Sequence, residues 1–229
     1  MTILGIIPAR GGSKSIPLKN IKHLNGKPLI EYTINTALAS KALDRVVVST
    51  DHDQIAGICE KFKGIEVIRR PAFLATDEAS TEMALLHVCD ELERRDGYIP
   101  DIVVTLEPTS PMRSAETIRK CVRVFSNSDA DSVVGVTETK DVFGKIVSGR
   151  FEHLFPNQPR RRQERESLYK ESSTIYATKL KILRQKKSVL GDMVYPLIID
   201  SMESVDINEA HDFLMAEAIQ LLKSKEGIS

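Results

Sequence analysis

A short segment near the N-terminus offers the residue types needed to bind an anion. It follows an apolar run at residues 3–7 and reads Pro8-Ala9-Arg10-Gly11-Gly12-Ser13-Lys14, with Lys19 and Asn20 shortly after. Adjacent glycines let a backbone approach a ligand closely and direct N–H groups at it, and arginine and lysine carry charge for phosphate oxygens. This combination suits a triphosphate.

The spacing within this segment matches neither G-x-x-x-x-G-K-[ST] nor G-x-G-x-x-G, which argues against a P-loop hydrolase and a dinucleotide-binding dehydrogenase. An isolated Gly-Gly with nearby lysines is about as often a solvated turn as an anion site. Ligands of open α/β sheets bind at the carboxyl ends of strands, however, and this segment leaves the first predicted strand. Its position therefore favours a phosphate site.

Polar clusters follow two further apolar runs. Ser49-Thr50-Asp51 places a carboxylate at a strand end, where beginning a helix is a simpler role than contacting a ligand. Arg69 and Arg70 follow the next run and suit an anion, although paired arginines are more often surface residues. Ser80 and Thr81 stand at a predicted helix start, where turn and cap chemistry alone would explain them.

A fourth cluster lies directly after the apolar run at residues 102–106. Pro108 and Pro111 fix the shape of this loop, and Glu107, Thr109 and Ser110 offer polar contacts. Taken alone, the loop could be only a rigid strand-to-helix turn.

The last cluster combines Asp206 and Asn208, which alternate outward on an extended segment. Two oxygen ligands on one side suit Mg²⁺. Asn208 immediately precedes a predicted helix and can equally cap it, so Asp206 is the better metal ligand of the two.

The elements that would position these residues alternate between short β-branched runs and longer segments of helical period. The predicted strands are residues 3–7, 45–49, 66–68, 102–106, 132–136, 174–177 and 195–199, and the predicted helices are residues 29–40, 53–62, 81–94, 116–125 and 209–222. Asp53, Ser114 and Asn208 are the candidate caps. We expect an α/β fold in one domain, residues 1–229, with a mostly parallel sheet covered by helices on both faces.

The alternation breaks at residues 138–172, where two glycines, two prolines and the basic run 160–165 replace helical periodicity. Long irregular connections in compact domains usually carry function or are disordered. A lid, a substrate loop and a dimerisation arm all remain open, although most members of such a basic run are usually solvated.

Composition limits the partners. The 229 residues carry 32 Lys+Arg and 32 Asp+Glu, so a net charge of zero disfavours nucleic acid and anionic membrane partners. Cys59, Cys89 and Cys121 are dispersed and predict reduced residues within helices. The apolar start is too short for a signal peptide, and no run approaches membrane-spanning length, which predicts a cytoplasmic protein.

Taken together and in this order, the clusters resemble the acylneuraminate cytidylyltransferase family, the CMP-sialic acid synthetases. Each motif is weak alone, but seven lie in register over nearly the whole chain. They are Pro8-Ala9-Arg10-Gly11-Gly12-Ser13-Lys14, Pro17-Leu18-Lys19-Asn20, Val48-Ser49-Thr50-Asp51, Arg70-Pro71, Leu74-Ala75-Thr76-Asp77, Pro108-Thr109-Ser110-Pro111 and Val205-Asp206-Ile207.

The resemblance implies a Rossmann-like nucleotidyltransferase fold, dependence on Mg²⁺, and a homodimer in which an arm, here residues 138–172, reaches into the partner's sugar site. CTP and a 2-keto sugar acid would be the substrates. It implies catalytic roles for Arg10, Lys19 and Asp206, with Asp206 and Asn208 as the metal-site residues. The implied nucleotide-binding residues are Arg10, Gly11, Ser13, Lys14, Lys19, Asn20, Arg70, Ser80 and Thr81.

The implied sugar-binding residues are Glu107, Thr109, Ser110, Lys145, Arg162, Tyr169, Lys170 and Tyr176, some of which would act across the dimer. Three positions depart from the family: Glu107 replaces a common glutamine, Lys170-Glu171-Ser172-Ser173-Thr174-Ile175-Tyr176 replaces Arg-x-Asn-Gly-Ala-Ile-Tyr, and Asn208 replaces an acidic residue. A carboxylate at Glu107 cannot donate as an amide does, which puts N-acetylneuraminate in doubt.

The alternatives are a cytidylyltransferase for the eight-carbon acid KDO, an enzyme that activates a sugar 1-phosphate, a non-catalytic nucleotide-binding module and a protein-binding domain. Pro108-Thr109-Ser110-Pro111 favours a nine-carbon acid over KDO. The retained Arg10, Lys19 and Asp206 argue against a non-catalytic module.

Overall fold

The computed structural model describes residues 1–13 and 15–226. Seven strands form the main sheet, in the order β11-β7-β10-β6-β1-β4-β5. They are β1 (Ile3–Pro8), β4 (Arg45–Thr50), β5 (Ile65–Arg69), β6 (Ile102–Thr105), β7 (Ser132–Thr139), β10 (Leu168–Lys179) and β11 (Val194–Ile198). Only β10 runs antiparallel to its neighbours, so the carboxyl ends of the other strands meet at one edge.

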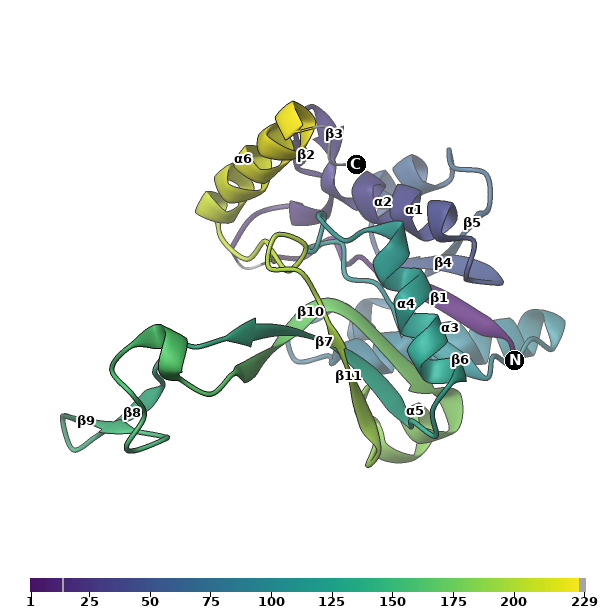
Figure 1. Cartoon of the computed structure of the whole chain (residues 1–229). Coiled ribbons are helices and arrows are strands. Elements are labelled where there is room, and N and C mark those ends of the chain that lie inside the picture. Colours follow the sequence, from purple (N-terminus) through teal and green to yellow (C-terminus); the bar gives the residue numbers. More distant parts are fainter. Residues whose placement is uncertain (14, 227–229) are drawn as a thin grey trace.

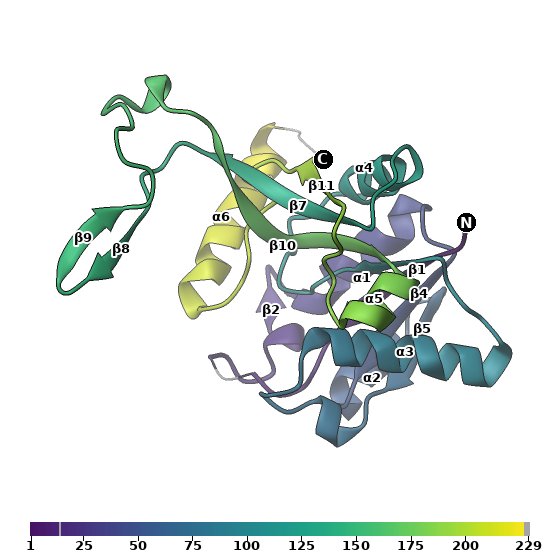
Figure 2. The ribbon, with the colours of Figure 1, turned by 90° about the horizontal axis from the view of Figure 1, so that it is seen from below.

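Helices cover both faces of this sheet, as Figures 1 and 2 show. On one face, Ile3 and Ile7 of β1 pack in a core with α1 (Leu29–Ser40), α2 (Asp53–Cys59) and α4 (Ala115–Ser126). On the other, Leu4 and Ile6 pack with α3 (Thr81–Asp96) and α5 (Leu180–Lys186). Because successive side chains of a strand point to opposite faces, one apolar strand serves both cores. The predicted α/β fold is confirmed.

A third apolar cluster lies over the carboxyl edge of the sheet. Here α6 (Ala210–Glu226) packs through Phe213 and Ala216 against Leu24 of the short hairpin β2 (His23–Leu24) and β3 (Lys27–Pro28). Ile207 and Met112 belong to the same cluster. The segment before α6 is thereby fixed against the loops that follow β1 and β6.

Residues 138–172 form most of a projecting arm. Strands β7 and β10 continue outward as a two-stranded ribbon that leads to the hairpin β8 (Gly144–Val147) and β9 (Arg150–His153), with η3 (Arg162–Glu164) beyond it. The arm points away from the body in both views (Figures 1 and 2). Strand β10 is irregular between Glu171, which pairs with Val136, and Tyr176, which pairs with Val134.

Most predicted elements are present, with shifted bounds. All seven strands and five helices form, but β2, β3, β8, β9, α5 and the short 3-10 helices η1 (Lys19–Ile21), η2 (Ala72–Leu74) and η3 were not predicted. Ser114 caps α4 by accepting from Thr117 N–H, as predicted. The cap of α2 is His52 and not Asp53: the His52 side chain accepts from Gln54 N–H, and Asp53 pairs with Arg69 instead.

Cys59, Cys89 and Cys121 are free and buried in α2, α3 and α4, which confirms that they are helix residues. Within the described ranges, no helix is both long and apolar enough to cross a bilayer.

Candidate active site

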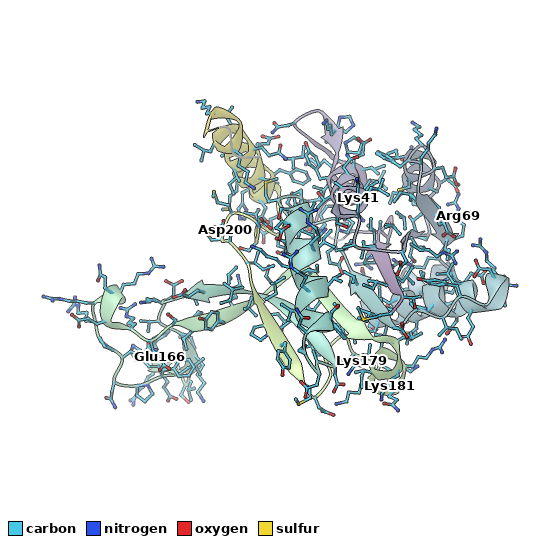
Figure 3. All side chains as sticks on the ribbon, turned by 45° about the vertical axis from the view of Figure 1, so that its right-hand side comes forward. Lys41, Arg69, Glu166, Lys179, Lys181 and Asp200 are labelled. Carbon is cyan, nitrogen blue, oxygen red and sulfur yellow. The ribbon has the colours of Figure 1, made fainter. Side chains whose placement is uncertain are left out.

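Two adjoining cavities lie at the carboxyl edge of the sheet. The first, of about 220 Å³, is lined by Pro8, Arg10, Gly12, Ser13, Lys19, Asn20, Arg70, Ala79, Ser80, Thr81, Glu107 and Thr109. The second, of about 400 Å³, is lined by Lys19, Thr81, Glu82, Thr105, Glu107, Thr109, Ser173, Tyr176, Val189, Asp206 and Asn208. Four residues belong to both walls, so two ligands could meet there. In Figure 3, Asp200, which follows β11, marks this end of the sheet, and Lys179 and Lys181 mark the opposite end.

The loop after β1 is held closely against its surroundings. Gly11 N–H donates to Asp51 Oδ1 (2.8 Å), and Asn20 Nδ2 donates to the Arg10 carbonyl (3.0 Å). A Cβ on Gly11 would lie 2.7 Å from His52 Cδ2, whereas a Cβ on Gly12 would meet nothing within 4 Å. Gly11 therefore serves close packing and its N–H is already used, while Gly12 lines the first cavity.

Arg10 is fixed by the loop before α3. Its Nη1 lies 2.9 Å from Asp77 Oδ1 and donates to the Thr76 carbonyl at 2.8 Å. The guanidinium is one-third exposed on the cavity wall, so part of its charge can face a ligand. The Leu74-Ala75-Thr76-Asp77 segment therefore positions this cation.

Arg70 is buried directly after β5. Its Nε donates to Ser49 Oγ (3.1 Å) and its Nη2 to the Ser49 carbonyl (3.0 Å). Burial lowers the pKa of Arg70, and the charge of Asp51 opposes this effect. Ser49 and Asp51, predicted mainly to begin a helix, thus support two neighbouring walls of the cavity.

Lys19 stands between the two cavities. Its Nζ donates to the Ile207 carbonyl at 2.8 Å. Burial lowers the pKa of Lys19, while the charges of Asp206 and Glu107 oppose this fall. The residue links the first loop of the chain to the segment that carries Asp206.

The N-terminus of α3 forms another wall of the first cavity, through Ala79, Ser80 and Thr81. Ser80 Oγ accepts from Met83 N–H at 3.4 Å, so Ser80 caps the helix and also faces the cavity. The first turn of a helix presents partial positive charge, which favours a bound anion or carbonyl oxygen.

Glu107 follows β6 and lines both cavities. Its backbone carbonyl accepts from Arg113 Nη2 at 2.8 Å, and Arg113 is itself only 3% exposed. Burial raises the pKa of the Glu107 carboxyl from 4.5 to about 7; Asp206 adds to the rise, and Arg113 opposes it.

Asp206 presents one unused oxygen at the second cavity. Its Oδ2 accepts from Asn208 Nδ2 at 2.7 Å, and its Oδ1 is buried without a hydrogen-bond partner. A buried carboxylate oxygen of this kind fits a hard cation such as Mg²⁺. Among the described residues no group of three or more His, Cys, Asp or Glu could hold a metal alone, so further ligands would come from substrate phosphates and water.

The predicted sugar-binding residues divide into two sets. Glu107, Thr109 and Tyr176 line the second cavity, and Ser110 lies behind it with Oγ 3.3 Å from Ser173 Oγ. The remaining four lie on the arm, outside both cavities of their own chain: Lys145, Arg162, Tyr169 and Lys170. The labelled Glu166 in Figure 3 shows how far this part of the chain projects. Lys14 lies outside the described residues.

Sequence reasoning missed four residues of the second cavity: Glu82, Thr105, Ser173 and Val189. Glu82 directly follows Thr81, which was predicted, and Ser173 lies in the segment 170–176 that differs from the family motif, so both could have been found from their neighbours. Val189 follows α5, which was not predicted, and no feature of the sequence pointed to it.

Comparison with known proteins decides the family. A family model described as "Cytidylyltransferase" matches residues 4–213. The chain belongs to the cytidylyltransferase family.

Two known proteins are similar to this cytidylyltransferase over most of its length. The chain is 33% identical to the CMP-N,N'-diacetyllegionaminic acid synthase of Legionella pneumophila, over 98% of this chain and 99% of the relative. It is 30% identical to the N-acylneuraminate cytidylyltransferase of Streptococcus agalactiae serotype V, over 91% of this chain but 51% of the relative. The chain thus spans about half the length of that second relative.

Solved structures agree on the fold. A CMP:2-keto-3-deoxy-manno-octonic acid synthetase complexed with CTP superposes with a TM-score of 0.73 at 17% identity, covering 97% of this chain and 100% of that one. A 4-diphosphocytidyl-2C-methyl-D-erythritol synthase from Anaerococcus prevotii gives 0.70 at 18%, covering 96% of each. This cytidylyltransferase is therefore a nucleotidyltransferase in fold and in family.

The packing of Gly11 predicts a contrast between neighbouring glycines. Gly11→Ala should lower the free energy of unfolding by about 1–3 kcal/mol, because the new methyl group meets His52, which is anchored as the α2 cap. Gly12→Ala should change it by less than about 0.5 kcal/mol in the ligand-free cytidylyltransferase. Urea denaturation of both variants measures this, and equal losses would contradict the packing role.

The pKa of Glu107 predicts a pH-dependent stability. The folded chain holds this proton more tightly than the unfolded chain, so this group makes stability fall as pH rises from 4.5 to about 7. Glu107→Gln should therefore raise the free energy of unfolding at pH 8 by about 1–3 kcal/mol and change it little below pH 4.5.

Denaturation at both pH values, with EDTA present, checks the sign. Glu116→Gln is the matched control: bonds from Arg119 and Arg123 lower the pKa of Glu116, so that variant should lose stability at pH 8. A gain in both variants would show that the effect is not specific to burial of Glu107.

Proposed function

We propose that this cytidylyltransferase transfers CMP from CTP to the anomeric hydroxyl of a nonulosonic acid and releases pyrophosphate. The observation that carries the proposal is the pair of cavities that share Lys19, Thr81, Glu107 and Thr109. One is lined with cations and a helix N-terminus and suits a nucleotide triphosphate; the other has mixed polar walls and suits a sugar. The names of the Legionella and Streptococcus relatives support the same class of acceptor.

In the proposed reaction, the anomeric oxygen attacks the α-phosphorus of CTP. A new P–O bond forms as the bond between that phosphorus and the α–β bridging oxygen breaks, the proton of the anomeric hydroxyl passes to solvent, and pyrophosphate leaves in line. Catalysis of this kind rests on positioning and charge neutralisation, with no covalent nucleophile on the protein. Arg10 and Lys19 would hold phosphate oxygens, and Arg70 and the N-terminus of α3 would hold the remaining part of the nucleotide.

Asp206 would hold the Mg²⁺ through its unpartnered Oδ1, beside Asn208. When bound, the ion supplies positive charge to the phosphate oxygens. The bond from Asn208 Nδ2 occupies Asp206 Oδ2 and keeps the carboxylate in one orientation. Because Asp206 is the one carboxylate of the proposed Asp206–Asn208 metal site, CTP phosphates would supply the other charged ligands.

The acceptor's own carboxylate needs a cation, which the second cavity offers only as Lys19 among its described lining residues. The arm carries exposed Lys145 and Arg162, together with exposed apolar residues such as Ile146 and Phe151. We infer that two chains form a homodimer in which each arm completes the partner's second cavity.

The proposed reaction predicts metal-dependent pyrophosphate release. With CTP, Mg²⁺ and a panel of eight- and nine-carbon 2-keto acids, the wild-type chain should release pyrophosphate with a nine-carbon acid. Asp206→Ala should reduce the rate by a factor of about 100 or more because the metal loses its fixed ligand. Asp200→Ala, a carboxylate six residues earlier outside both cavities, is the matched control. Activity confined to the eight-carbon acid would identify the KDO-type alternative, and CTP binding without turnover would favour a non-catalytic module.

The proposed dimer predicts complementation between two inactive variants. Asp206→Ala disables the body of one subunit, and Lys145→Ala/Arg162→Ala disables the arm of the other. Mixed dimers then contain one intact site if the arm acts in the partner, and the mixture should recover about a quarter of wild-type turnover for a symmetric dimer. Co-refolding followed by the pyrophosphate assay measures this. Recovery near zero, with dimers seen by light scattering, would place the arm at its own chain's site.

A further inference from the structure

Glu107 is chemically out of place in the first cavity. It is the one acidic side chain among the described residues of a wall that also carries Arg10, Lys19 and Arg70. A carboxylate there opposes the binding of a triphosphate, since like charges in a partly desolvated site repel strongly. Its presence is explained only if it contacts a different group, and it also lines the second cavity.

The surroundings of Glu107 fix its backbone and leave its carboxylate free. Arg113 Nη2 (2.8 Å) and Thr33 Oγ1 (3.4 Å) both donate to its carbonyl oxygen, and Pro108 follows it. Arg113 Nε donates a hydrogen bond to the Thr174 carbonyl. No hydrogen bond or ion pair from the described residues reaches the Glu107 carboxylate oxygens, so they are available to a ligand at the junction of the two cavities.

Above its pKa of about 7, the Glu107 carboxyl is ionised and only accepts hydrogen bonds. It can then bind a hydroxyl or amino group, but it repels an acetamido group that turns its carbonyl oxygen, and not its N–H, to the same position. A site built to hydrogen-bond one substituent rejects an analogue that leaves the buried group unpaired or opposed.

We propose that Glu107 determines which acceptor is used, by accepting a hydrogen bond from a hydroxyl or amino substituent of the sugar acid and disfavouring an acetamido carbonyl there. The inference rests on the proposed function and narrows it. The favoured substrates are nonulosonic acids that present a donor at the position facing Glu107.

The test compares acceptor affinities, so that it does not depend on turnover. Pairs of nine-carbon 2-keto acids that differ only by a hydroxyl or an acetamido group at C5 or C7 are titrated calorimetrically, at about pH 8 where Glu107 is mostly ionised, into the chain saturated with a non-hydrolysable CTP analogue and Mg²⁺. For at least one pair, the wild type should favour the hydroxyl compound by about 10-fold or more, and Glu107→Gln, which can donate, should reduce or invert that ratio.

Two controls separate this role from a general change of charge. Asp200→Asn removes a carboxylate outside both cavities and should leave every ratio unchanged. Glu107→Gln should also tighten binding of the CTP analogue, because a repulsive charge is removed, and this shows that the variant is folded.

Unchanged ratios in Glu107→Gln for all pairs would overturn the inference, as would equal shifts in Asp200→Asn. Weak binding of every acceptor to both the wild type and the variant would also overturn it. Failure of the proposed function appears differently, as acceptor binding with the predicted ratios but no pyrophosphate release from CTP itself.

Discussion

The wall of the second cavity depends on the hydrogen bonds of the Arg113 guanidinium. This guanidinium is almost fully buried and joins three elements through the Glu107 carbonyl, the Thr174 carbonyl and the Thr33 hydroxyl. Burial lowers the pKa of Arg113 to about 10, so the group stays charged at neutral pH. Its planar fork donates to the Thr174 carbonyl in the irregular part of β10 and to the Glu107 carbonyl after β6, and so ties these two segments together.

The bonds of Arg113 explain why residues distant in sequence form the second cavity together. The irregular segment of β10 brings Ser173 against Ser110, and the regular ladder resumes at Tyr176, on the same wall. Removing Arg113 would take away the donor of the Thr174 carbonyl, at a cost of about 1–3 kcal/mol, while the Glu107 carbonyl would keep the bond from Thr33 Oγ1. The shape of the second cavity therefore depends on hydrogen bonding, while the first cavity depends on the Arg10–Asp77 ion pair and the close packing of Gly11.

Local patterns were enough to predict the sheet and the strand-end loops. The continuous apolar run of β1 and the helical periods of α1 and α4 are properties of adjacent residues, and so is the cap at Ser114. The contacts Arg10–Asp77, Gly11–Asp51 and Lys19–Ile207 join residues from different parts of the chain, and no local pattern encodes them. Strands β8 and β9 were missed because both faces are exposed, so no apolar alternation marks them, and α5 is too short to show a period.

Ile207 has a consequence for how the protein is made. Its N–H donates to the Thr109 carbonyl, and its own carbonyl accepts from Lys19, so one residue near the end of the chain connects a loop from the middle with one from the start. Synthesis on the ribosome proceeds from the N-terminus, and folding of early segments follows that direction. The loop after β1 is translated among the first twenty residues, yet Lys19 Nζ lacks this acceptor until Ile207 has emerged from the exit tunnel. A nascent chain should therefore remain unable to organise the site until most of it has been translated.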